Sequence, residues 1–270
     1  MWCPFPEPSN EFSSLEGGGM ITVMSMNLRF GLADDGENRW ALRQHLLPAF
    51  FAAHPADVIG FQEVNDFQAT VLRQLLPNHQ YIGVRPDAPE RWQHNLIFYP
   101  AHWICESSGH YYLSDTPDTP SKLEGSQWPR QFVAGCFHTG RQRLLVANTH
   151  FDFNADVQVA AARIALNLLA RFPKNLPRVL TGDFNAVPGS LCHTLLTSGA
   201  EGFQDAFDGA HVPTHHNFTG QSDGGQIDWI LYSGKGMTTV ACGAVTTSFR
   251  GRYPSDHFPV WARFRLISNK

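Results

Sequence analysis

The chain has 270 residues, of which 43% are hydrophobic and 16% charged, and its formal net charge at pH 7 is -4. This length and composition favour an ordinary globular protein with a sizeable core. The mildly acidic balance argues against a general nucleic-acid binder with a basic surface, although an enzyme could still bind one phosphate group locally.

The N-terminal segment, residues 1–19, reads MWCPFPEPSNEFSSLEGGG and is rich in proline and glycine. It is predicted to be a disordered tail, followed by a single domain over residues 20–267. The five cysteines are widely scattered without a CxxC pair, which argues against a disulfide framework. With no secretory signal and no apolar run of the ~20 residues that span a membrane, the sequence predicts a cytoplasmic protein.

The first half of the domain alternates strand-like and helix-like patterns. An apolar run predicts a strand at 21–28, and a helix follows at 37–54 with a disturbance at Pro48, because proline cannot donate a backbone hydrogen bond. A second strand and helix are predicted at 57–64 and 66–76. Two further strands are predicted at 95–100 and 132–139.

The second half begins with a strand at 143–151 and continues with the clearest helix of the chain, at 154–172. Asn154 is expected to cap this helix, and an apolar stripe recurs at helical spacing until Pro173. The remaining strands are predicted at 178–184, 226–233 and 257–266. Many strands with few helices, in mixed order, predict two packed sheets flanked by helices.

Polar side chains recur at the ends of these apolar strands. Such side chains are costly to bury unless they are paired or bind a metal. Strand ends that share one edge would bring them into a single pocket rich in oxygen ligands, which Mg²⁺ or Mn²⁺ prefers, with histidines beside them. The residues concerned are Asn27, Glu63, Asn148, His150, Asp152, Asp183, Asn185, Asp228, Asp256 and His257.

The motifs that carry these residues resemble those of the endonuclease/exonuclease/phosphatase superfamily, which includes DNase I. In chain order they read SMNLR, FQEV, NTHFD, TGDFNAVP, QIDWI and PSDHFPV, and they extend from residue 25 to residue 260. Each motif alone is weak, but the ordered set is specific. YYLSDTPDTP (111–120) and WPR (128–130) are similar to a bacterial subgroup whose substrates are largely unassigned.

The resemblance implies a four-layer α/β/β/α sandwich of two mixed sheets flanked by helices. It also implies a divalent-metal-dependent hydrolase of phosphoester bonds, with Mg²⁺ or Mn²⁺ as cofactor. Glu63 would be the principal metal ligand, assisted by Asn27 and Asp256. The substrate would be a phosphoester, either a small molecule or a nucleic acid, and no protein partner is indicated.

Five residues receive catalytic roles from the same resemblance. Asp183 would orient or deprotonate the attacking water, and Asn185 would donate to the scissile phosphate. His257 would contact a phosphate oxygen while Asp228 holds its ring and favours the charged form. His150 would bind or protonate the phosphate from another side.

Three further residues are assigned to substrate binding. Arg130, with Arg29 as a second candidate, would bind phosphate, since guanidinium groups bind phosphate oxygens in pairs. Asn148 of the NTHFD motif is placed with them. At the position where abasic-site nucleases carry an aspartate, this chain has Arg29, which argues against an abasic-site repair enzyme.

The partner of His150 is left open by a second departure. DNase I-like members carry a supporting glutamate near HNLIFY, and the nearby residues here are Gln93, His94 and Asn95. An alternative function is a non-catalytic module that binds a phosphate ligand on the same fold. GQSDG (220–224) fits a serine-hydrolase motif but lacks its strand–helix context, and HVPTHH (211–216) favours a loop over a zinc cluster.

Overall fold

The computed structural model describes residues 18–85, 91–198, 202–222 and 224–267. Strand β1 (Gly18–Asn27) includes the last two residues of the predicted tail, because both pair with the end of the last strand. Residues 1–17 of that tail lie outside the described part of the chain.

The first sheet contains six strands in the order β11-β12-β1-β2-β4-β3. Strand β1 runs parallel to β2, and its other neighbour, β12, is antiparallel to it. The remaining strands of this sheet are β2 (Val58–Val64), β3 (His79–Ile82), β4 (His94–Pro100), β11 (Met237–Ala244) and β12 (Val260–Ile267).

The second sheet has the order β5-β6-β7-β8-β10-β9, and only β7 and β8 are parallel within it. The parallel pair therefore lies near the middle of each sheet. The strands are β5 (Ile104–Tyr112), β6 (Gln131–His138), β7 (Arg143–His150), β8 (Arg178–Asp183), β9 (Gln204–Asp205) and β10 (Asp228–Ser233).

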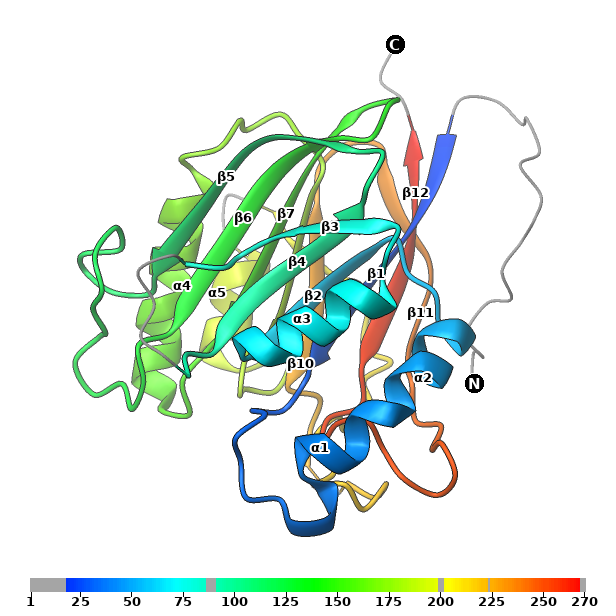
Figure 1. Cartoon of the computed structure of the whole chain (residues 1–270). Coiled ribbons are helices and arrows are strands. Elements are labelled where there is room, and N and C mark those ends of the chain that lie inside the picture. Colours follow the sequence, from blue (N-terminus) through cyan, green and yellow to red (C-terminus); the bar gives the residue numbers. More distant parts are fainter. Residues whose placement is uncertain (1–17, 86–90, 199–201, 223, 268–270) are drawn as a thin grey trace.

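Helices lie outside the two packed sheets (Figure 1), and the alternation of side chains along the strands fills these layers. In β1, Ile21 and Val23 pack into the core between the two sheets, whereas Met24 and Met26 pack toward the helices on the outer face. In β8, Leu180 packs toward α4 (Ala155–Leu169) and α5 (Leu191–Ser198). The four-layer α/β/β/α sandwich is thereby confirmed.

The predicted helix at 37–54 is wrong as a continuous element. The chain forms 3₁₀ turns η1 (Gly36–Asn38) and η2 (Gln44–Leu46) and two short helices, α1 (Trp40–Arg43) and α2 (Leu47–Ala53). Pro48 lies in the first turn of α2, where its missing N–H costs nothing. Its ring excludes a regular turn around the residue four positions earlier, which is where η2 begins.

The other predicted helices are confirmed within a few residues as α3 (Asp66–Leu75) and α4. Asn154 caps α4 by accepting hydrogen bonds from the backbone N–H groups of Asp156 and Val157. Strand β5 was missed because most of its residues are exposed or half-buried and leave no apolar run. Among the described residues, no helix is long and apolar enough to cross a membrane.

Candidate active site

The strand register brings the predicted residues to one edge of the sandwich. In the second sheet, His150, Asp183 and Asp228 are direct partners on three adjacent strands. In the first sheet, Asn27 ends β1, and its amide donates to Glu63 Oε1 at 3.1 Å. The same amide donates to Asp183 Oδ2 at 2.9 Å, so that one side chain joins the ends of both sheets.

Asp183 is the centre of this arrangement and is only 1% exposed. Its Oδ1 accepts from the backbone N–H of Asn185 at 3.0 Å. Its Oδ2 lies 3.4 Å from His150 Nε2 and 3.9 Å from His257 Nε2. Burial, together with the neighbouring Asp228 carboxylate, raises the pKa of Asp183 to about 7. A carboxyl with this pKa exchanges a proton near neutral pH, as a general base requires.

His257 and Asp228 form a buried ion pair. His257 Nδ1 lies 2.9 Å from Asp228 Oδ2, which leaves Nε2 facing Asp183. Burial opposes the charged ring, but the carboxylates of Asp228 and Asp183 prevail and raise the pKa of His257 well above its ordinary value. The ring is therefore a cation at neutral pH.

His150 has the opposite electrostatic character. Burial, then the nearby charges of Arg130 and His257, lower the pKa of its ring well below the ordinary value. Its Nε2 lies 3.1 Å from Asn185 Nδ2, which identifies Asn185 as a hydrogen-bond partner. The site therefore combines a neutral imidazole on one side of Asp183 with a charged one on the other.

The residues near β4 do not supply a carboxylate for His150. His94 Nε2 lies 3.0 Å from Asp66 Oδ1, and Asn95 donates to the backbone carbonyl of Gln131. Asn185 is instead a hydrogen-bond partner of His150. It adopts a left-handed conformation with φ of 49°, which asparagine tolerates. This conformation directs its amide toward both His150 and the carbonyl of Phe151.

Glu63 also has a positive φ, of 62°, which is uncommon for a residue with a side chain. The pairing of β2 with β4 shifts register between Phe61 and Val64, so Glu63 lies in a strand irregularity. Irregularities of this kind re-aim side chains next to functional sites. Here the carboxylate accepts from the Phe30 N–H at 2.7 Å and from Asn27.

Arg130 is buried beside the same centre, and its charge acts on both Asp183 and His150. Among the described residues its Nε has no hydrogen-bond acceptor, and this atom lies 3.7 Å from Asp152 Oδ2. Asp152 accepts from Ser126 Oγ and from the Gln127 N–H, both at 2.9 Å. Asp152 therefore anchors the loop that carries Arg130.

Arg29 lies next to Asp256. Its guanidinium is held by two groups, Asp35 at 2.8 Å and Asp256 at 3.5 Å. Its φ of 60° marks a tight bend immediately after β1. The bend allows its backbone N–H to donate to Asn27 Oδ1 at 2.8 Å and so to fix the Asn27 side chain.

Arg43 is a residue that the sequence analysis missed. It is fully buried and donates to the backbone carbonyls of Leu28, Arg29 and Pro254, each at 2.8 Å. These carbonyls belong to the segments that follow Asn27 and precede Asp256. An arginine in a helical pattern is ordinarily read as solvent-exposed, so no sequence signal distinguished this one.

The substrate-binding assignment of Asn148 requires correction. This side chain is fully buried between the sheets, where Oδ1 accepts from Gln62 at 2.7 Å and from Thr181 at 3.1 Å. Its amide donates to the carbonyls of Phe61 and Leu96. A Cβ on Gly60 would meet Thr181 Oγ1 at 2.2 Å, so glycine is needed there. Asn148 joins the sheets and has no free group for a substrate.

Replacing Asn148 with alanine is expected to lower the free energy of unfolding by about 2–4 kcal/mol, because buried partners lose their hydrogen bonds and a cavity opens. Urea denaturation monitored by tryptophan fluorescence measures this change. A variant of unchanged stability but a raised KM would instead restore the substrate-binding role.

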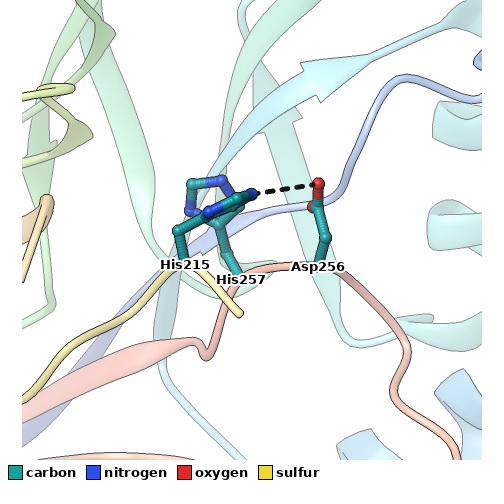
Figure 2. A group of neighbouring side chains, drawn as sticks. All are labelled: His215, Asp256 and His257. Atoms are coloured by element: carbon teal, nitrogen blue, oxygen red, sulfur yellow. Dashed lines mark ion pairs between the residues drawn. The ribbon is translucent and has the colours of Figure 1, made fainter. Parts of the chain in front are cut away.

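Three overlapping groups of carboxylates and imidazoles could hold a metal ion among the described residues. Glu63, His150 and Asp183 form one, Asp183, Asp228 and His257 a second, and His215, Asp256 and His257 a third. Figure 2 shows the third, which includes a histidine that the sequence analysis did not select. The carboxylate oxygens of Glu63 and Asp183 are ligands that suit Mg²⁺ or Mn²⁺. The group that contains Asp256 offers two imidazole nitrogens and one carboxylate.

A protein-family model and several solved structures are similar to this chain. The family model described as Endonuclease/Exonuclease/phosphatase family matches residues 24–257. A Bacteroides thetaiotaomicron structure described as an endonuclease/exonuclease/phosphatase family protein is 29% identical, with a TM-score of 0.83, over 92% of this chain and 98% of that chain. No protein of the curated set matches significantly.

Two further structures extend the comparison. A mannosyl-6-phosphatase of Bacteroides thetaiotaomicron VPI-5482 is 30% identical, with a TM-score of 0.81, over 90% of this chain and 99% of that chain. The human nocturnin catalytic domain, solved with a bound sulfate anion, is 22% identical, with a TM-score of 0.67, over 91% of this chain and 93% of that chain. The nocturnin likeness concerns the fold alone.

Proposed function

Because the chain belongs to the endonuclease/exonuclease/phosphatase family, we propose that it is a divalent-metal-dependent hydrolase of phosphoester bonds that uses Asp183 to activate water. The observation that carries this proposal is the position of Asp183, which contacts Asn27, Asn185, His150 and His257 at the meeting point of the two sheets. Family membership and the neighbouring structures support a phosphoester hydrolase, and the roles below are the proposed mechanism.

Asp183 accepts the proton of the attacking water. Its pKa of about 7 gives it the basicity for this step, and its hydrogen bonds to Asn27 and Asn185 hold the carboxylate in place. A water positioned in line with the scissile bond gains much of its reactivity from orientation alone.

The charged His257 and the Asn185 amide donate to the phosphate oxygens, where negative charge accumulates. Asp228 keeps His257 protonated and orients its ring. On the other side, Arg130 and neutral His150 complete the set of groups that contact phosphate. The pairing of a base near neutrality with a persistent cation suits hydrolysis near pH 7.

Glu63, Asn27 and Asp256 would hold Mg²⁺ or Mn²⁺, which when bound offsets the negative charge of the phosphate group. The acidic oxygens and the amide of these side chains are donors that these ions prefer. Arg29 remains a second candidate for phosphate binding, although Asp35 already engages its guanidinium.

The substrate is proposed to be a small or single-stranded phosphoester. The net charge of -4 does not favour long duplex DNA, whose phosphates bind best to basic proteins. The likeness to a mannosyl-6-phosphatase supports small phosphorylated compounds as the first class to test.

Treatment with EDTA is expected to abolish phosphoester hydrolysis, and added Mg²⁺ or Mn²⁺ is expected to restore it. The assay is a panel of bis-p-nitrophenyl phosphate, sugar phosphates, inositol phosphates and oligonucleotides. Full activity in EDTA would contradict metal dependence. Binding of a phosphorylated compound without turnover in either metal would favour a non-catalytic module.

A further inference from the structure

Backbone hydrogen bonds join the loop at 214–217 to the segment that carries Asp256 and His257. The backbone N–H of His216 donates to the Asp256 carbonyl at 2.8 Å, and the Phe258 N–H donates to the Thr214 carbonyl at 2.8 Å. His215 and His257 face each other in an isolated antiparallel bridge. These bonds place the His215 side chain beside the candidate active site.

Within that frame, three donor atoms converge. His215 Nε2 lies 3.9 Å from Asp256 Oδ2, and the His215 and His257 rings stand edge to face with centroids 5.0 Å apart. One ligand atom from each of the three residues lies within 4.8 Å of the others. Figure 2 shows the two imidazoles and the carboxylate gathered in this way.

His257 already has the supporting contact that metal-binding histidines require. Its Nδ1 is held by Asp228 Oδ2 at 2.9 Å, which leaves Nε2 as the atom able to bind an ion. A carboxylate behind an imidazole fixes ring orientation and strengthens the ligand in zinc sites. His215 is half exposed, so its ring is free to close the distance to an ion.

Two imidazoles and one carboxylate form a set that suits Zn²⁺ and Co²⁺ better than Mg²⁺, which prefers oxygen. We propose that His215, Asp256 and His257 form a transition-metal site at which Zn²⁺ inhibits the enzyme. Bound Zn²⁺ displaces the Nε2 proton of His257 into solvent and takes its place, so this ring can no longer donate to phosphate. The inhibitory effect rests on the proposed function, whereas metal binding does not.

Cobalt binding tests the site directly. The full chain is titrated with Co²⁺ at about pH 8, because the imidazoles must lose their protons to bind a metal. Wild type is expected to develop visible absorption bands that Zn²⁺ abolishes. His215→Ala is expected to bind Co²⁺ about 10–100-fold more weakly, the range seen when supporting groups of a metal site are removed. Wild-type affinity in His215→Ala would overturn the proposal.

His102→Ala is the matched control, since His102 is an exposed histidine far along the chain from this cluster. It is expected to bind Co²⁺ as wild type does, and equal weakening in both variants would assign the bands to surface histidines. Thermal melts verify that both variants fold.

The inhibition is measured as the Zn²⁺ concentration that halves the Mg²⁺-supported rate of each variant relative to its own zinc-free rate. His215→Ala is expected to need about 10-fold more Zn²⁺. Equal Zn²⁺ sensitivity would reject inhibition through this site. If no phosphoester is hydrolysed at all, the proposed function fails, and the cobalt titration still decides the metal site.

Discussion

Asp183→Asn is expected to lower kcat/KM for phosphoester hydrolysis by about 10²–10⁴-fold, the usual contribution of a general base. Asparagine matches aspartate in shape but cannot accept the proton of the attacking water. Initial rates with Mg²⁺ on the best substrate of the panel give the measurement. An Asp183→Asn enzyme of near wild-type activity would refute the proposed role.

Asp118→Asn is the control for this change, since Asp118 is an exposed carboxylate that pairs with Arg171 at 2.9 Å. It removes one negative charge from the chain without touching the site. Its activity is expected to match that of wild type, so a loss confined to Asp183→Asn reports on the site itself.

Asp183→Asn is also expected to stabilise the fold. Burial and Asp228 raise the pKa of Asp183 to about 7, above the ordinary value of 3.8. The folded chain therefore holds this proton more tightly than the unfolded chain, and stability falls as pH rises from about 4 to about 7. Asp183→Asn removes this loss but also removes the attraction to charged His257, so the free energy of unfolding at pH 8 should rise by only about 1–2 kcal/mol.

Urea denaturation in EDTA at several pH values measures this stability difference. The gain should shrink toward pH 4, where wild-type Asp183 is protonated in both states. A constant gain at all pH values would mean that the carboxyl is not the cause. Lost activity with gained stability is the pattern expected of a residue retained for chemistry.

Asp228→Asn is expected to lower kcat/KM by about 10²–10⁴-fold as well, because His257 loses the carboxylate that keeps it charged. The carboxylates of Asp228 and Asp183 overcome burial and raise the pKa of His257 well above 6.5. Without Asp228, burial should bring this pKa down, so the basic limb of the pH–rate profile should move to lower pH. Part of the activity should return as the pH is lowered.

The pH–rate profile measures how activity depends on pH, and an NMR titration of the His257 ring measures its pKa. Asp205→Asn is the matched control, because Asp205 Oδ2 lies 3.2 Å from His193 and 2.8 Å from His211, outside the candidate site. It removes a carboxylate that pairs with histidine, yet it should leave the profile unchanged. An unshifted His257 pKa in Asp228→Asn would contradict the proposed pairing.

The His257–Asp228 pair stabilises the fold while the ring is charged, whereas Asp183 destabilises it when ionised. A histidine with a raised pKa in the folded chain contributes its full stability below 6.5, the ordinary value of the ring. This contribution is lost as pH rises through the pKa of the folded state. Because the pKa of both Asp183 and His257 is raised in the folded chain, both groups make stability fall as pH rises.

Local patterns in the chain were enough to predict most strands, the helices at 66–76 and 154–172, and the polar residues at strand ends. Alternation and capping act over a few residues, so they can be recognised in a linear chain. The broken helix at 37–54 was only partly foreseen, since Pro48 marked a disturbance without giving the 3₁₀ turn before it. Strand β5 had no apolar run to reveal it.

The order of six motifs, by itself, determined the family and the chemical class of the site. Only the tertiary structure decided which polar side chains meet at that edge of the sandwich, because contacts between distant segments depend on the register and packing of two sheets. Asn148 turned inward to join the sheets, Arg43 proved to be a buried support, and His215 was brought to Asp256 by bonds between two loops. A linear pattern records residue types, whereas burial and hydrogen-bond partners arise only when the strands assemble.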